Sequence, residues 1–411
     1  MRAFTRLASV EEALERFLQA AAPQPRGREV VPLERSLDRV VAEDLLATQD
    51  LPPFDRSTVD GFAVRAQDVR EAREDRPARL RVVGEIRMGE VVTFRIGPGE
   101  AARIPTGGML PGGADAVVMQ EHCRLVGDQV EVPRPVASGE NVIRQGQDIR
   151  RGEVAVPAGT RLRPQELGLL AGLGIVDVPV WLVPRVAIFS TGDEVVSPDQ
   201  LPRPGQVRDM NTHALSGLVA RLGGVPLPGR ILPDDEEAVT TGLREALRTS
   251  EVVLVSGGSS VGARDVLAAV IPRLGEPGIV VHGVAIKPGK PTLLAVCHGR
   301  AVVGLPGHPV SAQVVFEVFV RPLLEAMLGL RADLRGPREV PARLQKTLQA
   351  PRERDEFVRV AVRWEGEGLR AEPILGLSGM ITTMTRADGY VRVPRGVTLP
   401  EGSTVRVRLF G

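Results

Sequence analysis

The chain has 411 residues, more than one hydrophobic core usually organises, so we expect two to four domains. A formal net charge of +1 and an aromatic content of 3% argue against the basic surface and the stacking rings that nucleic acid requires. No apolar run approaches the roughly 20 residues of a membrane helix, and no secretory signal pattern is present. We therefore expect a cytoplasmic protein without nucleic-acid or membrane contact.

The first part of the chain combines helices with a β-rich stretch. Ser9 and Glu12 match a capping box at the start of an apolar stripe with helical spacing, which predicts a first helix. A second short helix is predicted over residues 36–46. Short β runs separated by glycine and proline predict a small β-rich domain over 79–156. Helix returns over 164–174, where proline suits the first turn.

Beyond residue 184, apolar strands and helices alternate. RVAIFS and EVVLVSGG read as buried strands, and the alternation predicts a mostly parallel sheet covered by helices. The helices are expected at 212–222, 236–248, 266–274 and 310–327. Ligands bind at the carboxyl ends of the strands in such sheets, which directs attention to the loops there. The last 80 residues alternate apolar and polar positions around turns, as in a small closed barrel or sandwich.

A glycine-rich loop follows the strand at 252–255. Its sequence, SGGSSVGARD, would expose consecutive backbone amides and two serine hydroxyls, which suits an oxyanion such as phosphate. The loop is neither a Walker A nor a Rossmann motif, and a tight structural turn is the alternative interpretation. The predicted ligand contacts in this loop are Gly257, Gly258, Ser259, Ser260 and Gly262.

Acidic residues follow the other strands. Asp193 and Glu194 lie in STGDE, Asp234 and Asp235 follow the strand that ends at residue 232, and Asp265 closes the glycine loop. Asp235 is interpreted as a helix cap. Carboxylates that converge on one sheet edge beside a phosphate loop suggest Mg²⁺, which takes oxygen ligands and bridges to phosphates.

Lysine is rare in this chain. Only three of the 52 basic residues are lysines, yet Lys287 and Lys290 lie three positions apart in IKPGKP. A compact ammonium group suits a point-charge task such as phosphate binding, and we expect these residues at the same sheet edge. The next motif, GLPGHPVSA, opens the long helix and offers a second anion-friendly end. Its predicted substrate contacts are Pro306, Pro309 and Ser311.

Nine motifs occur in order along the chain, namely DRSTVDGFAV, RIPTGG, GADAVVMQE, QGQDI, FSTGDE, RDMN, SGGSSVGARD, IKPGKP and GLPGHPVSA. Through these motifs the chain resembles the MoeA-type molybdopterin molybdenumtransferases, bacterial relatives of the E domain of gephyrin. The resemblance covers essentially the whole length.

The resemblance implies an elongated subunit and a homodimer with its active site at the subunit interface. An α/β central domain of the molybdopterin-binding type (181–330) would be joined by an N-terminal dimerisation domain (1–50 and 148–180). An inserted β-rich domain (51–147) and a C-terminal barrel-like domain (331–411) would complete the subunit. The implied reaction inserts molybdate into adenylylated molybdopterin with release of AMP, with Mg²⁺ or Zn²⁺ present. A molybdopterin adenylyltransferase would be a partner.

The resemblance also implies roles for individual residues. The catalytic positions that it implies are Asp60, Thr106, Asp148, Glu194, Asp234 and Asp265. Three of these, Glu194, Asp234 and Asp265, would hold the metal. Ser260, Lys287 and Lys290 match pterin-phosphate and nucleotide contacts, and Arg359 matches an arginine of the C-terminal domain. Because Asp60 is itself anionic, we expect it to orient a donor or a metal rather than to contact molybdate.

The sequence departs from the family at three positions. His308 stands where many relatives carry asparagine, Arg264 lies in the glycine loop, and Gly283 stands where some relatives have lysine. Two other functions compete: a molybdopterin adenylyltransferase and a gephyrin-like scaffold without catalysis. A stand-alone adenylyltransferase would lack DRSTVDGFAV and the C-terminal β domain. The acidic residues Asp60, Glu194 and Asp265 favour retained chemistry over a scaffold.

Overall fold

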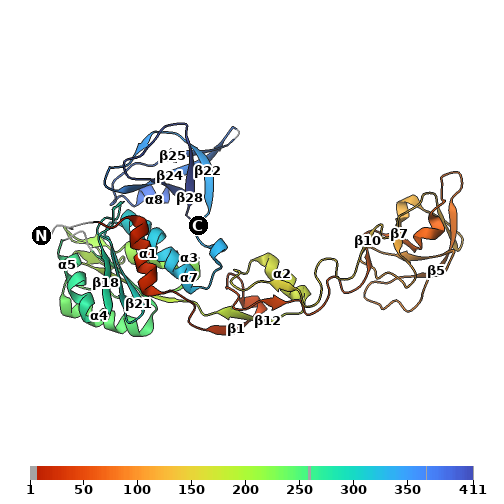
Figure 1. The fold of residues 1–411 in the computed structure, drawn as a ribbon, viewed down its shortest axis with the longest axis horizontal. Coiled ribbons are helices and arrows are strands. Elements are labelled where there is room, and N and C mark those ends of the chain that lie inside the picture. The colour runs from red at the N-terminus through yellow and green to blue at the C-terminus, as the bar shows by residue number, and fades with distance from the viewer. Residues whose placement is uncertain (1–6, 258–260, 367, 411) are drawn as a thin grey trace.

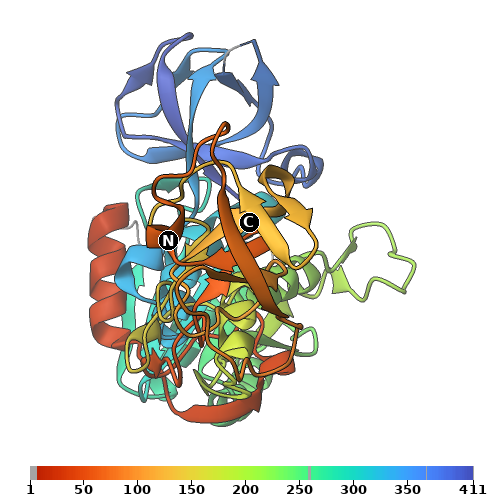
Figure 2. The ribbon, with the colours of Figure 1, turned by 90° about the vertical axis from the view of Figure 1, so that its right-hand side faces the viewer.

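The chain is elongated and built from several separately packed parts. The computed structural model describes residues 7–257, 261–366 and 368–410, with only the backbone described for 261–265. Figure 1 shows the central α/β domain at one end, a small N-terminal domain in the middle and an inserted β domain at the other end. A C-terminal β domain lies against the central domain, and Figure 2 shows the same arrangement from the end of the molecule.

The central domain contains a six-stranded sheet in the order β16–β13–β17–β21–β20–β18. Its strands are β16 (Val225–Pro228), β13 (Arg185–Thr191), β17 (Val252–Gly257), β21 (Arg300–Leu305), β20 (Leu293–Cys297) and β18 (Pro277–His282). Strand β13 runs parallel to β16 and β17, and β17 runs parallel to β21, whereas β20 is antiparallel to both of its neighbours. The predicted mostly parallel sheet is confirmed, and the carboxyl ends of β13, β17 and β21 share one edge.

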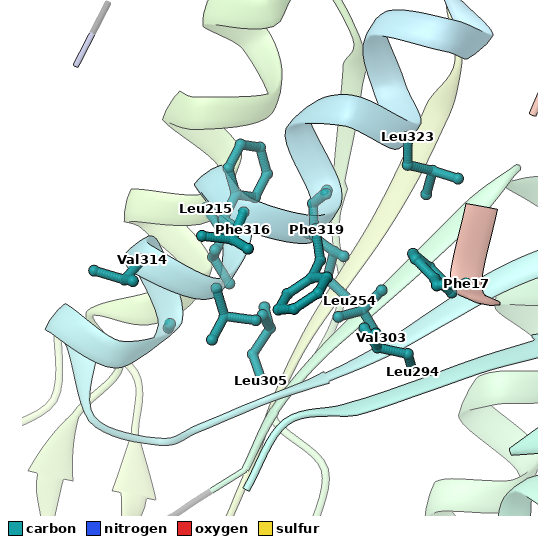
Figure 3. Packing of buried hydrophobic residues seen from close by; sticks show 14 of the residues in the cluster. Phe17, Leu215, Leu254, Leu294, Val303, Leu305, Val314, Phe316, Phe319 and Leu323 are labelled. Atoms are coloured by element: carbon teal, nitrogen blue, oxygen red, sulfur yellow. The ribbon is translucent and has the colours of Figure 1, made fainter. Parts of the chain in front are cut away.

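Helices cover both faces of this sheet. One face carries α1 (Val10–Ala21), α3 (Asn211–Leu222), α6 (Pro309–Val315) and α7 (Arg321–Met327), and the other carries α4 (Glu236–Thr249) and α5 (Val261–Val270). A π-helical turn, Phe316–Val320, joins α6 to α7, so the long helix predicted over 310–327 is present. Figure 3 shows Phe316 and Phe319 of this turn packed over Leu254 of the sheet.

The first helix packs on the central sheet. The Ser9 hydroxyl accepts a hydrogen bond from the Glu12 amide at 3.1 Å, so the predicted N-cap is confirmed. Val10, Ala13 and Phe17 are buried in the same cluster as the central strands. Although the sequence places α1 with the N-terminal domain, its apolar stripe is covered by β18 and β20.

The N-terminal domain is made of short paired strands and one helix. Its elements are β1 (Arg28–Pro32), β2 (Leu45–Leu46), β11 (Val154–Val156), α2 (Pro164–Gly172) and β12 (Asp177–Trp181). The helix predicted over 36–46 is wrong, because this segment forms turns, isolated bridges and β2. Val40 and Val41 are both buried but in different apolar clusters, an alternation that suits extended chain and not one helical face.

The inserted domain and the C-terminal domain are both β structures. The inserted sheet has the order β7 (Ala116–Met119), β4 (Gly61–Val64), β6 (Glu100–Ile104), β5 (Ala78–Glu85), β9 (Gln129–Val132) and β8 (Arg124–Val126). The C-terminal barrel closes through β24 (Asp355–Glu365), β25 (Gly368–Pro373), β22 (Glu339–Leu344), β28 (Thr404–Leu409) and β26 (Gly389–Val393), since β24 also pairs with β26. Strand β19 (Ile286–Lys287) pairs with β24 and joins the barrel to the central domain.

Minor elements complete the description. They are β3 (Arg56–Ser57), β10 (Val142–Ile143), β14 (Val195–Val196), β15 (Val207–Arg208), β23 (Leu348–Gln349), α8 (Thr382–Thr385) and β27 (Thr398–Leu399). Among the described residues, none of the helices combines the length and the hydropathy needed to cross a membrane.

Candidate active site

Two cavities adjoin at the carboxyl edge of the central sheet. The cationic cavity, about 750 Å³, lies between the turn 286–291, the start of α6, the strand β24 and the barrel loop 374–380. The edge cavity, about 370 Å³, lies over the ends of β13 and β17 and the segment 205–211. Gly307 and His308 line both cavities, so the two spaces meet at the start of α6. These volumes are typical of sites for small molecules.

Positive charge dominates the cationic cavity. Lys287, Lys290, Arg354 and Arg359 line it, against the single carboxylate of Glu356. The Lys287 ammonium lies 2.8 Å from Glu356 Oε1, which fixes its position across the domain boundary. Four cations around one space can bind an anion with two or more phosphate groups. Lys287 and Lys290 therefore line one cavity, and their role as phosphate contacts stays a prediction.

Gly289 shapes the turn that carries both lysines. Its φ of +120° lies in the region that favours glycine, and a Cβ there would come within 2.7 Å of Val315 Cγ2 in α6. The turn can therefore pack against the helix only with glycine at this position. As a result, both lysine side chains stand at the cavity wall.

Arg359 reaches the cationic cavity from the barrel. Its side chain is buried, and Nη2 donates to the Gly376 carbonyl at 2.9 Å. In the part of the chain that the structure describes, Nε has no hydrogen-bond partner. Burial lowers the pKa of Arg359, with the Glu356 charge acting in the opposite direction. A bound anion would supply the missing acceptor, so the geometry fits the predicted role of Arg359 as a substrate contact.

His308 connects the start of α6 with the barrel loop. Its Nδ1 lies 2.7 Å from the Ser378 hydroxyl, and the Val310 amide donates to the Ser378 carbonyl at 3.2 Å. One amide at the start of α6 is therefore already used by the protein, although this motif was expected to offer an anion-binding end. Pro306 and Ser311 line the cationic cavity, and Pro309 lines the edge cavity.

Carboxylates gather after β13 in the edge region. Thr191 forms a parallel bridge with Leu232, which brings the segment after β13 beside Asp234. Gly192 has a φ of +137°, and a Cβ there would lie 2.4 Å from Glu194 Oε2, so glycine lets this carboxylate fold back over the backbone. The Asp234 amide donates to Asp193 Oδ1 at 3.3 Å.

The ionised carboxylate of Asp234 is disfavoured by its surroundings. Burial raises its pKa, and the charges of Glu194 and Asp193 raise it further. Its Oδ1 is buried, and no hydrogen-bond partner for it occurs among residues 7–257, 261–366 and 368–410. A divalent cation relieves such a cluster, because it neutralises like charges and coordinates a free carboxylate oxygen. Glu194 and Asp234 thus fit a metal.

Asp265 is the third predicted metal ligand. Asp265 belongs to α5 beyond the carboxyl end of β17, but its side chain is not among the described ones. The described residues alone contain no group of three or more side chains arranged to hold a metal ion. Of the predicted loop contacts, Gly258, Ser259 and Ser260 lie outside the described residues. Gly257 lines the edge cavity, and Gly262 falls in α5.

Three predicted catalytic residues lie far from these cavities. Asp60 precedes β4 of the inserted domain, and its Oδ1 accepts hydrogen bonds from the Thr106 amide at 2.6 Å and the Thr106 hydroxyl at 2.9 Å. These bonds lower the pKa of Asp60 and fix the Thr106 hydroxyl, whose only hydrogen is used on Asp60. The expectation that Asp60 orients a donor or a metal stays a prediction. Asp148 is exposed near the start of the inserted domain, where its amide bonds to the Leu51 carbonyl. Figure 1 shows this domain at the opposite end of the chain from the central sheet.

The structure adds a polar network that site prediction from sequence missed. Asp209 and Asn211 lie in the RDMN motif, line the edge cavity and are buried. Asp209 Oδ1 accepts from the Ser190 hydroxyl at 2.8 Å, and Asn211 Nδ2 donates to the Ser256 hydroxyl at 2.6 Å. The motif was visible in the sequence, but only the fold shows that it packs beside the ends of β13 and β17.

Comparisons with known families match three parts of the chain. Residues 8–174 match the family described as MoeA N-terminal region (domain I and II). Residues 187–326 match the Probable molybdopterin binding domain, and residues 341–410 match the MoeA C-terminal region (domain IV). The three matches follow the order of the domains in the fold.

Full-length relatives agree with these matches. The chain is 34% identical to the molybdopterin molybdenumtransferase of Bacillus subtilis, over 98% of this chain and 94% of that protein. It is 35% identical to the molybdopterin molybdenumtransferase of Synechococcus elongatus, over 97% and 99% of the two chains. The solved structure of the molybdopterin biosynthesis moeA protein from Pyrococcus horikoshii OT3 superposes with a TM-score of 0.87 at 33% identity, covering 98% of this chain and 100% of that one.

Proposed function

The chain belongs to the MoeA family, and from this premise we propose that it inserts molybdenum from molybdate into adenylylated molybdopterin and releases AMP. The observation that supports this most directly is the pair of adjoining cavities at the sheet edge, one cationic and one bordered by carboxylates. A phosphoanhydride substrate needs cations for its phosphates, and its cleavage needs the charge of the leaving group to be neutralised.

We assign separate roles to the side chains of the cationic cavity and to the carboxylates that follow β13 and Leu232. Lys287, Lys290 and Arg359 hold the anionic substrates, molybdate and the phosphates, and the Glu356 carboxylate keeps Lys287 in place. Glu194 and Asp234, with Asp265 from α5, would hold a divalent ion, Mg²⁺ or Zn²⁺. When bound, that ion would neutralise charge that develops on the phosphate oxygens as the anhydride bond breaks.

The inserted domain contributes from a second copy of the chain. Within one chain, the Asp60–Thr106 pair lies at the end opposite the cavities. A homodimer in which the inserted domain of one subunit reaches the central domain of the other would bring the pair to the substrate, and Asp148 with it. The Thr106 hydroxyl donates its only hydrogen to Asp60 Oδ1, so it would offer the substrate an acceptor oxygen. The adenylylated substrate itself would come from a molybdopterin adenylyltransferase.

The test is AMP release from adenylylated molybdopterin in the presence of molybdate and Mg²⁺. The double variant Glu194→Gln and Asp265→Asn should lose activity by about 100-fold or more, because the ion would lose two of its carboxylates. The double variant Glu237→Gln and Glu245→Gln is the matched control, since it removes two exposed carboxylates of α4 outside both cavities. Unchanged AMP release in the first variant would refute the proposed chemistry.

The same purified protein separates the competing functions. An adenylyltransferase would consume ATP and molybdopterin and would form the adenylylated compound instead of cleaving it. A scaffold without catalysis would release no AMP from adenylylated molybdopterin, with or without molybdate. Release of AMP that depends on molybdate is the outcome specific to molybdenum insertion.

A further inference from the structure

Asn211, which lines the edge cavity, has a side-chain oxygen without a hydrogen-bond donor among the described residues. Asn211 is the first residue of α3, is 8% exposed and lines this cavity. Its Oδ1 is buried, and none of the described residues gives it a hydrogen bond. Leaving a buried acceptor unpaired is costly, so such an atom calls for a partner from outside the chain.

The orientation of the Asn211 amide is fixed by its neighbours. Nδ2 donates to the Gly307 carbonyl at 2.8 Å and to the Ser256 hydroxyl at 2.6 Å. A carbonyl can only accept, so the opposite orientation would set two acceptor oxygens against each other. The amide therefore uses both of its donors on the protein, and Oδ1 can serve only as an acceptor for something else.

Asp209, which lines the same cavity, has a second acceptor oxygen. Its Oδ1 accepts from the Ser190 hydroxyl at 2.8 Å and from the Thr212 amide at 3.1 Å, and neither bond uses Oδ2. Ser190 of β13 and Ser256 of β17 are direct partners in the register of the sheet. Asp209 and Asn211 are therefore anchored on adjacent strands. The backbones of two such neighbouring strands lie about 4.8 Å apart.

We propose that Asp209 and Asn211 form a subsite that recognises the 2-amino-4-oxopyrimidine edge of the pterin. This edge carries a ring N–H beside an amino group, so it presents neighbouring donors to neighbouring acceptors. The subsite rests on the proposed function, which supplies a pterin substrate, and deepens it by naming the residues that read the ring. The phosphate end would then extend past His308 into the cationic cavity.

Such a subsite makes a sharp distinction between two ring systems. Lumazine has the pterin skeleton with an oxygen in place of the amino group, so it would set an acceptor against the acceptors of the protein. A site built on buried acceptors rejects a ligand that lacks the donor, because its own groups stay unpaired. We expect the full-length protein to bind pterin about 10-fold to 100-fold more tightly than lumazine.

The variant Asp209→Asn tests the subsite without disturbing its anchors. Asparagine retains an oxygen for the Ser190 and Thr212 bonds and replaces Oδ2 with an amino group that donates. Binding of pterin should weaken about tenfold or more, and binding of lumazine should strengthen, so the preference collapses or inverts. Asp199→Asn is the matched control, because it removes an exposed carboxylate that lies between β14 and β15 and does not line the cavity.

Fluorescence titration of the purified full-length protein with pterin and with lumazine measures these affinities, and thermal unfolding checks that the variants stay folded. Equal affinities for the two rings, no saturable binding of pterin, or a preference that Asp209→Asn leaves unchanged would overturn the proposal. Neither ring carries phosphate, so the titration is independent of AMP release. A protein that releases AMP but does not distinguish the rings would contradict the subsite alone, and the reverse result would contradict the proposed function alone.

Discussion

Asp234 has a carboxyl group whose ionised form is less favourable in the folded chain than in the unfolded one. Burial raises its pKa above the ordinary value of 3.8, and Glu194 and Asp193 add to the shift. At a pH where Asp234 is ionised, its raised pKa lowers the free energy of unfolding. Below its ordinary pKa the carboxyl is protonated in both the folded and the unfolded chain, so this loss of stability disappears. The folded chain thus keeps an unfavourable charge where a cation is expected.

The variant Asp234→Asn should therefore be more stable than the native chain at pH 7 without divalent ions. The difference in melting temperature should shrink as the pH falls toward 4, because the native carboxyl becomes protonated. Mg²⁺ should then stabilise the native chain more than the variant, since it binds the folded state. Equal melting temperatures at pH 7 in the presence of a chelator would contradict this assignment.

Single residues could be predicted from sequence only where their chemistry or position is unusual. The two lysines of IKPGKP are predicted because the chain has only one other lysine and otherwise uses arginine, and both line the cationic cavity. Asn211 could not be found, because what marks it is an unpaired oxygen, and its pairing is decided by neighbours from two other segments, at Ser256 and Gly307. Its motif was visible, but its role was not.

Arg321 shows how the helix across the π-turn depends on buried charge. It lies between Glu317 and Glu325, with Nε 2.6 Å from Glu317 Oε2 and Nη1 3.5 Å from Glu325 Oε1. Burial alone would lower the pKa of Arg321, but the hydrogen bond and charge of Glu317, with the charge of Glu325, raise it. All three side chains are buried in the region where the barrel contacts the central domain.

The variant Arg321→Met should lose about 3–5 kcal/mol of unfolding free energy, because two buried carboxylates would lose their counter-charge. The control is Arg331→Met, which removes an arginine from an exposed pair with Asp333 and should cost less than about 1 kcal/mol. Urea unfolding of both variants measures the difference. A loss at Arg321 no larger than the loss at Arg331 would show that the buried cluster does not stabilise the fold.

Elements were predictable where one periodicity ran long enough. The helices at 212–222 and 236–248 match α3 and α4 closely, because each buries a single apolar face on the sheet. The prediction of a helix over 36–46 is wrong, since Val40 and Val41 pack in two different apolar clusters. Local pattern cannot show which neighbour covers a side chain, and that neighbour decides between helix and extended chain.

At the scale of the whole molecule, the distribution of site residues follows the elongated shape. Lys287, Lys290 and Glu194 gather at the central sheet, whereas Asp60 and Thr106 lie in the inserted domain at the far end. The expected domains 51–147 and 181–330 already separate these residues along the chain, but their places in space come only from the fold. The cores are local, since the inserted domain and the barrel each bury their own apolar clusters, so the domains form without bringing these residues together.

The account therefore depends on an active site shared between two copies of the chain. The measurement that tests it most directly is AMP release from a mixture of two inactive variants, Asp60→Asn and Lys290→Ala, after subunit exchange. With equal amounts, half of the dimers would be mixed, and each would contain one intact site, so activity should return to about a quarter of the native value. Failure of the mixture to exceed either variant alone, with mixed dimers present, would contradict a site built from two subunits.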